Sequence, residues 1–196
     1  MSDYSQHPSI LAFHLFSYVV RNHMLINKGI QNSVLNLFSS YSGGCSVGFH
    51  LRLSGTLSDF KERSIYENFL FESDINTLQE CKYIDYQKRP VFYVASDSSL
   101  VKERIRANSN ATVITHNATS LHTGHAIGGD KEQTAFQSVL FDIVALSTCN
   151  MLIVTKGSSL SYLAAAYQGN VPYYISRNTT CYYPTSLTTL APSSWS

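Results

Sequence analysis

The sequence has little charge and no block of one sign. Only 14% of the 196 residues are Asp, Glu, Lys or Arg, and the formal net charge is +1. Proteins that bind nucleic acid through its phosphates need clustered positive charge, so we expect no nucleic-acid partner. Hydrophobic residues make up 44% of the chain, which is enough to form a core. The composition therefore predicts a folded domain.

Cysteine is also scarce. The four cysteines, at positions 45, 81, 149 and 181, are widely spaced and form no CxxC pair. We therefore expect neither a disulfide framework nor a zinc site. Cys149 stands just before an apolar run and is interpreted as a small buried hydrophobic residue. His122 and His125 have the spacing of a metal-binding pair, but no cysteine or carboxylate accompanies them, so we interpret them as loop residues and expect no metal.

The sequence contains no convincing signal peptide or membrane span. The apolar stretch 9–20 is interrupted by His14 and Ser17, follows no basic segment and is too short to cross a bilayer, so it predicts an amphipathic helix. Asn-x-Thr sequons begin at three asparagines, Asn110, Asn117 and Asn178. About two sequons would arise by chance in a chain this rich in Asn, Ser and Thr, so they do not determine the compartment.

Strand and helix patterns alternate along the chain. Helical spacing of apolar residues or capping signals predict helices at 25–40, 64–80, 98–107, 131–147 and 159–168. Short runs rich in β-branched and aromatic residues predict strands at 45–53, 90–96, 111–115, 150–155 and 172–176. This order predicts an α/β fold, a Rossmann-like parallel sheet with helices on both faces, where ligands bind beyond the carboxyl ends of the strands. We expect an N-terminal helical segment (1–44), a nucleotide-sugar-binding domain (45–180) and a tail (181–196).

Two side chains at the end of the first predicted strand have chemistry suited to an anion. His50 and Arg52 alternate with the alkyl residues of the stretch 45–53 and share its other face. One interpretation is an edge strand with a solvated face. The other is an anion site, because the guanidinium of arginine presents a planar fork of donors that matches phosphate oxygens. The pattern leaves both open.

Asp142 is the second candidate. On the predicted helix 131–147 it is aligned with the apolar positions Ala135, Val139 and Leu146. A carboxylate beside an apolar stripe is costly unless it is paired. It therefore belongs to a core salt bridge, to an exposed flank of the helix, or to a site where it accepts hydrogen bonds from a ligand. Guanine suits the last role, since its N1–H and N2 amino group are adjacent donors.

The third candidate is the turn in "VTKGSSLSYLAAA" (154–166). The start of a helix has free backbone N–H groups and the positive end of the helix dipole, which together favour anions. Gly157 lets the backbone approach a ligand closely, and Ser158, Ser159 and Ser161 offer hydroxyl groups. The turn is either a simple strand-to-helix connection with a serine cap or a phosphate site.

The fourth candidate is Asp97 in "ASDSS" (95–99), where a predicted strand runs into a helix. An aspartate in this position commonly caps the helix. It is also placed to line the crevice at the end of the strand.

Together these stretches resemble one group of enzymes. The ordered segments "VGFHLRLSG", "VFYVASDSS", "HTGH" and "FDIVALSTCNMLIVTKGSSLSYLAAAYQG" are similar to the motifs of fucosyltransferases that use GDP-fucose, a group that includes the α1,2-, α1,6- and protein O-fucosyltransferases. The resemblance covers about residues 45–170. It implies the C-terminal, donor-binding half of a GT-B glycosyltransferase.

The resemblance also implies roles for individual residues. Arg52 corresponds to the arginine on the β-phosphate and His50 to its neighbour in the donor site. Asp142 matches the acid that binds guanine, and Ser158 with Ser159 matches the turn around the diphosphate and ribose. Three further donor-site residues are implied, Asp97, Thr155 and Gly157. The implied reaction is inverting transfer of fucose to a glycan or protein hydroxyl, without a cofactor or a required metal.

Two departures from the family pattern bear on activity. The first acid after Arg52 is Asp59, which with Glu62 is the candidate base for the acceptor hydroxyl. Only about forty residues precede the first motif, too few for an acceptor-side domain. We therefore expect a fragment, a subunit that borrows its acceptor side, or a domain that has kept binding and lost transfer. The alternative is a non-catalytic nucleotide-binding or interaction module on the same fold. A flavodoxin-like or other α/β binding domain is a third possibility that rests on fold analogy. The resemblance implies the Golgi or ER lumen, whereas the chain shows no signal or anchor.

Overall fold

The structure is a computed structural model. It describes residues 8–41, 44–52, 84–108, 111–116, 130–155, 158–176 and 179–182. The structural findings below concern these residues. The predicted helix 64–80, the histidines of "HTGH", the three sequon asparagines and the residues after 182 lie outside them.

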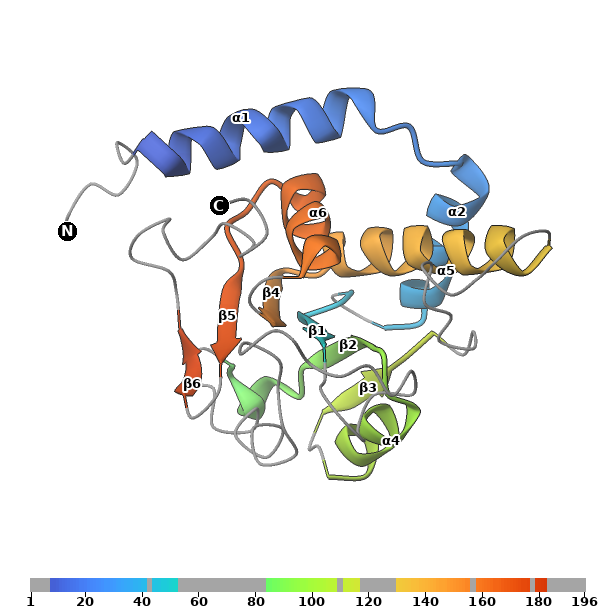
Figure 1. Ribbon diagram of the computed structural model, residues 1–196. Helices are drawn as coiled ribbons and strands as arrows, with labels where there is room; N and C mark the ends of the chain where they lie inside the picture. Colours follow the sequence, from blue (N-terminus) through green and yellow to red (C-terminus); the bar gives the residue numbers. More distant parts are fainter. Residues whose placement is uncertain are drawn as a thin grey trace.

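A six-stranded sheet forms the centre of the molecule, with the order β3-β2-β1-β4-β5-β6 (Figure 1). Its strands are β1 (Val47–Leu51), β2 (Val91–Ser96), β3 (Thr112–Ile114), β4 (Met151–Thr155), β5 (Tyr173–Ser176) and β6 (Thr179–Tyr182). The first five in this order are parallel, and β6 is antiparallel to β5. The register places His50 beside Ala95 on one side and Val154 on the other. The predicted Rossmann-like parallel sheet is confirmed.

Helices cover both faces of the sheet, as predicted (Figure 1). One face packs against α5 (Asp130–Ser147) and α6 (Ser159–Gln168), with α2 (Lys28–Ser39) against α5 and α1 (Pro8–His23) across α6. The other face packs against α4 (Ser99–Asn108). A single 3-10 turn, η4 (Tyr86–Lys88), precedes β2. The central strands alternate their side chains between the two cores, which explains why nearly every residue of β1, β2 and β4 is buried.

The N-terminal helix belongs to this packed body. Phe13 and Val20 of α1 are buried, and the hydroxyl of Ser17 donates to the carbonyl of Ala166 in α6 at 2.7 Å. The outer face of α1 exposes Leu15 and Tyr18, so the helix is confirmed but is less amphipathic than predicted. None of the helices in the described part of the chain is long and apolar enough to cross a membrane. The domain boundaries at residues 44 and 180 stay a prediction.

Cys149 is buried as expected, but it is not a simple hydrophobic residue, because it takes part in a disulfide that the sequence did not predict. Cys45 and Cys149 form a disulfide, although 104 residues separate them in sequence. Cys45 stands just before β1 and Cys149 just before β4, and these strands are neighbours, so the two Cα atoms are 4.4 Å apart. Spacing along the chain gave no sign of this pairing. It depends on which strands the fold brings together.

The edge-strand interpretation of the segment around His50 is also wrong. β1 lies between β2 and β4, and all five of its residues are buried. His50 therefore faces the interior on the side of α6, and its polar ring needs a partner there.

Candidate functional site

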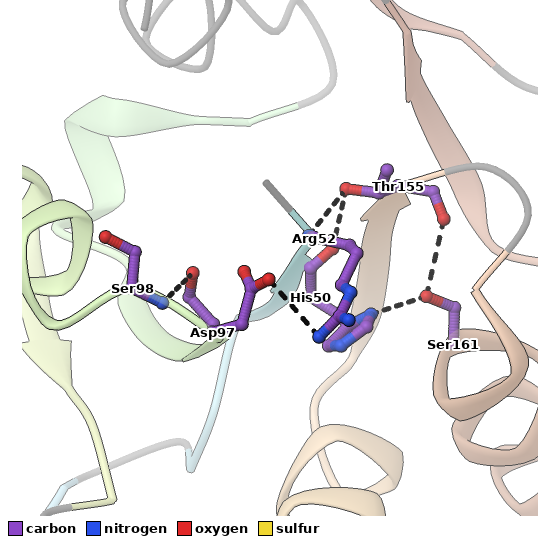
Figure 2. A network of polar contacts seen from close by, with 7 residues as sticks. His50, Arg52, Asp97, Ser98, Thr155 and Ser161 are labelled. Carbon is purple, nitrogen blue, oxygen red and sulfur yellow. Dashed lines mark hydrogen bonds and ion pairs between the residues drawn. The ribbon is translucent and has the colours of Figure 1, made fainter. Parts of the chain in front are cut away.

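Four of the predicted site residues meet at the carboxyl ends of three adjacent strands. His50 is in β1, Arg52 follows it, Thr155 ends β4 and Asp97 follows β2 (Figure 2). The strands that follow β1 in the chain, β2 and β3, are added on one side of it, whereas β4 lies on its other side and is followed there by β5. The boundary between β1 and β4 is thus the topological switch point, where doubly wound sheets bind their ligands.

Thr155 joins the two strands at this switch point. Its hydroxyl accepts a hydrogen bond from the backbone N–H of Arg52 at 3.0 Å and donates to the carbonyl of His50 at 3.3 Å. The Thr155 side chain is completely buried. The Thr155 hydroxyl thereby extends the hydrogen bonding between β1 and β4 beyond their last backbone pair, His50 and Val154. It also fixes the backbone of Arg52 at the end of β1.

His50 connects β1 to the first turn of α6. Its Nδ1 lies 2.6 Å from the hydroxyl of Ser161, and that hydroxyl also lies 3.5 Å from the carbonyl of Thr155 (Figure 2). Burial, together with the nearby charge of Arg52, lowers the pKa of His50 to about 3. The imidazole is therefore neutral at pH 7, and the positive charge at this point belongs to Arg52.

Arg52 extends from the end of β1 toward the end of β2. Its Nη1 lies 3.2 Å from Oδ2 of Asp97, and the two side chains are 17% and 6% exposed (Figure 2). The residue that caps α4 is Ser98, which follows Asp97. The hydroxyl of Ser98 takes that role by accepting from the N–H of Val101 at 3.3 Å, while Ser96 accepts from the N–H of Ser98. The carboxylate of Asp97 is thus directed at the guanidinium of Arg52.

The turn into α6 uses its serines in an unusual way. Ser158 occupies the N-cap position, but its side chain makes no capping hydrogen bond. Ser159 is exposed, and Ser161 is buried against His50. A serine at this position usually accepts from the second or third N–H of the helix. The interpretation of a plain serine cap is therefore wrong for Ser158, whose hydroxyl is not committed to the helix. Gly157, the other predicted residue of this turn, lies outside the described residues.

Asp142 stands over the same sheet edge, on α5. Leu146 of α5 packs directly against Gly48 of β1. Asp142 precedes Leu146 by four residues, which is about 6 Å along a helix that runs antiparallel to the strands. A strand advances about 3.3 Å per residue. Asp142 is therefore about two strand residues nearer the carboxyl edge than Gly48, which is the level of His50.

The partner of Asp142 is a tyrosine. The hydroxyl of Tyr93, in β2, donates to Oδ1 of Asp142 at 2.5 Å. Burial raises the pKa of Asp142 to about 6, although the hydrogen bond from Tyr93 and the charge of Lys102 both act to lower it. Within the described part of the chain Asp142 forms no ion pair, so the core-salt-bridge interpretation is wrong for these residues.

Sequence reasoning missed three contributors to this edge. Ser161 was noted for its hydroxyl but not as the partner of His50. Tyr93 appeared only as a strand residue, although its place on the same face as Ala95 follows from strand alternation. His116, which follows β3, stacks on Phe141 with ring centroids 4.1 Å apart. Burial and the charge of Lys102 lower the pKa of His116.

Two further predictions bear on this site. The candidate bases Asp59 and Glu62 lie outside the described residues. Among the residues that the structure describes, no group of three or more His, Cys, Asp or Glu side chains is placed to hold a metal ion.

Comparison with known proteins places the fold. No protein-family model matches the sequence, and no curated protein matches it. The solved structures that match include the α-1,6-fucosyltransferase NodZ soaked with GDP-fucose, at 16% sequence identity and a TM-score of 0.51, over 79% of this chain and 46% of that one. A mutant of FUT1 from Arabidopsis thaliana in complex with GDP matches at 13% identity and a TM-score of 0.50, over 81% of this chain and 36% of that one. The chain thus spans less than half the length of these structures. The predicted similarity in fold to GDP-fucose-dependent fucosyltransferases is confirmed.

Proposed function

We propose that this chain is a donor-binding domain that binds GDP-fucose and takes part in inverting transfer of fucose to a hydroxyl of a glycan or protein. The observation that carries the proposal is the arrangement of His50, Arg52, Thr155 and Ser161 at the switch point of the sheet. The shared fold with the two fucosyltransferase structures supports it. The acceptor and the residues that surround it belong to a separate domain or subunit.

The diphosphate lies between Arg52 and the start of α6 in this proposal. Arg52 contacts the β-phosphate with its guanidinium fork, and Ser158, Ser159 and the backbone of Gly157 contact the diphosphate and ribose. The first N–H groups of a helix have no partner within the helix, so they are available to phosphate oxygens. His50 and Thr155 contribute mainly by holding these groups in place. Asp97 contributes by lining the crevice beside Arg52.

Arg52 has its largest effect when the bond from fucose C1 to the phosphate oxygen breaks. The acceptor oxygen then attacks C1 from the opposite face, and negative charge accumulates on the departing GDP. Fixed positive groups aimed at that charge lower the barrier, and removal of one such donor typically costs about 3–4 kcal/mol. Arg52 and the dipole of α6 supply this charge in our proposal without a required metal. Asp59 is the candidate base that accepts the proton of the acceptor hydroxyl.

Asp142 binds the guanine base in the same proposal. A carboxylate can accept from N1–H and from the N2 amino group of guanine together. Its position at the level of His50, on the helix that flanks the crevice, supports this role. Uracil and adenine do not present this pair of adjacent donors on one edge, so the carboxylate favours GDP over UDP and ADP.

Titration calorimetry with GDP, UDP and ADP tests the binding part of the proposal. We expect GDP to bind the most tightly, and Arg52→Ala to weaken it by at least tenfold. Arg106→Ala is the matched control, because Arg106 also makes one side-chain hydrogen bond, to Thr115, but at the exposed end of α4. Equal binding of all three nucleotides, or of none, would overturn the assignment of guanine.

Assays of GDP-fucose hydrolysis and transfer test the catalytic part. Release or transfer of fucose that is lost in Arg52→Ala supports the transferase. If GDP binds tightly and no acceptor or partner domain restores turnover, the chain is the non-catalytic nucleotide-binding module that is our second candidate.

A further inference from the structure

Tyr93 is held so that its hydroxyl points at the carboxylate of Asp142. The Tyr93 side chain is completely buried, and its ring meets Phe38 edge to face, with centroids 5.9 Å apart. The ring is thus held in one orientation, and its hydroxyl reaches Asp142 at 2.5 Å. A hydroxyl fixed in this way sets the direction of the carboxylate that it holds.

The carboxylate of Asp142 keeps most of its acceptor capacity. An ionised carboxylate has about four lone-pair positions for hydrogen bonds. Within the described residues Tyr93 is its hydrogen-bond donor, and that bond engages Oδ1 alone. Oδ2 and the second lone pair of Oδ1 are then available to a ligand at this edge of the sheet. A carboxylate with a single hydrogen-bond donor does not favour stability at this position, since burial of a poorly paired charge is costly.

We infer that Tyr93 is a positioning residue, which orients Asp142 and keeps it an acceptor so that it presents Oδ2 to the adjacent N–H donors of a guanine base. This inference rests on the proposed function and adds to it a residue that never touches the ligand. Without the Tyr93 hydroxyl, the carboxylate can rotate and can take up a proton, and in either case it loses an acceptor position toward the base.

The groups around Asp142 make this role measurable by titration. The Tyr93 hydroxyl and the charge of Lys102, on α4, both act to lower the pKa of Asp142. On the neighbouring elements, His50 of β1 has a pKa lowered to about 3 and is neutral, α6 has no charged side chain, and α2 has only Lys28, at its first residue. After β3, His116 stacks on Phe141 beside Asp142, and burial with the charge of Lys102 lowers its pKa. The pKa of Asp142 is about 6, so its protonation falls in a range where GDP binding can be followed. Loss of the Tyr93 hydroxyl raises that pKa further, because a donor to the charged form is removed.

The test is GDP affinity from pH 5 to pH 8.5 in the wild type, Tyr93→Phe and Tyr174→Phe. We expect wild-type affinity to fall below about pH 6 as Asp142 protonates. In Tyr93→Phe this midpoint moves to higher pH, and affinity at pH 7 falls roughly tenfold. Tyr174→Phe is the control for loss of a buried tyrosine hydroxyl in the same core, on β5, and should leave the midpoint unchanged. In Asp142→Asn the midpoint disappears, and addition of Tyr93→Phe to that variant has no further effect.

A direct readout separates this inference from the proposed function. Carbon-13 NMR of protein labelled at the aspartate carboxyls gives the pKa of Asp142 without nucleotide. If Tyr93→Phe leaves that pKa and the GDP midpoint where they are in the wild type, while GDP still binds, the positioning role is wrong and the proposed function stands. If GDP fails to bind the folded wild type at every pH, the proposed function falls and this inference falls with it.

Discussion

Arg52 and Asp97 form an ion pair across the ends of two adjacent parallel strands, with Nη1 3.2 Å from Oδ2. Arg52 is the more exposed partner, and Asp97 is nearly buried. The carboxylate of Asp97 therefore holds the guanidinium of Arg52 at the carboxyl ends of these strands. An arginine that is already held in one conformation loses less conformational entropy when it binds a phosphate than an arginine that moves freely in solvent.

We expect Asp97→Asn to lower the free energy of unfolding by about 1–3 kcal/mol, because the partly buried guanidinium of Arg52 then loses its ion pair with the Asp97 carboxylate. GDP affinity should fall less than in Arg52→Ala, since the guanidinium is still present. Urea unfolding and calorimetry measure the two effects. Asp85→Asn is the control, because Asp85 pairs with Lys88 in solvent and its loss should have no measurable effect. If Asp97→Asn is as stable as the wild type, the ion pair does not hold Arg52.

Asp142→Asn should stabilise the fold at pH 8 while it weakens GDP binding. The pKa of Asp142 is about 6 in the folded protein, above the usual aspartate value of 3.8, so the folded state binds this proton more tightly than the unfolded chain. The stability linked to that proton is present below pH 3.8 and is lost as the pH rises through 6. The asparagine resembles the protonated form, so we expect a gain of about 1–3 kcal/mol at pH 8 and almost none near pH 4.

Urea unfolding of both proteins at pH 4 and pH 8 measures that difference. In the same variant GDP affinity should fall by about one to two powers of ten, because an amide donor faces the donors of guanine. A variant that is less stable than the wild type at pH 8 would show that the carboxylate supports the fold, and the assignment to ligand binding would lose its main physical argument.

His50 should make the fold sensitive to acid. Its pKa is lowered from 6.5 to about 3, so the folded state resists protonation and the unfolded chain does not. The stability from neutral His50 is present above pH 6.5 and is lost as the pH falls toward 3, by up to about 1.4 kcal/mol per pH unit. His50→Asn keeps a polar group near Ser161 but cannot titrate. The slope of unfolding free energy against pH between 6 and 4 should therefore be flatter in this variant than in the wild type.

The disulfide should contribute substantially to stability. A bridge across a loop of this length, 104 residues, constrains the unfolded chain, and loss of such a bond typically costs about 2–5 kcal/mol. Thermal and urea unfolding with and without a reductant should show this loss in the wild type. The double variant Cys45→Ser, Cys149→Ser should start at the lower stability and respond little to the reductant. Complete alkylation of Cys45 and Cys149 in the unreduced, denatured protein would contradict the bond.

The strand and helix order could be predicted because local patterns determine it. Alternation in 45–53 and the apolar run 150–155 fixed β1 and β4 to within two residues. Both ends of α6 were predicted at the correct residue. Ser158 precedes the helix, and Gly169 ends it in a left-handed conformation with φ 91°. β6 was not predicted, because Thr179–Tyr182 is a strand through its pairing with β5.

The site could be predicted in part, at the level of which residues follow which strand. His50, Arg52, Thr155 and Asp97 converge because parallel strands end at one edge. Their partners could not be predicted, because a contact such as that of His50 with Ser161 depends on where α6 packs. The roles of these residues toward a ligand stay predictions, as does every role assigned to Asp59, Gly157 and Ser159.

The packing of α5 against the sheet depends on the absence of a side chain at Gly48. A β-carbon at position 48 would lie 2.8 Å from Leu152, 3.1 Å from Leu146 and 3.2 Å from Cys149, all at the junction of β1, β4 and α5. Even a methyl group there requires the ends of the Leu152 and Leu146 side chains to move, and Leu146 lies on α5 one turn from Asp142. A substitution at a residue outside the proposed binding site can therefore still affect that site. If Asp142 binds guanine as we propose, a substitution at Gly48 should alter nucleotide selectivity although Gly48 itself does not contact the base.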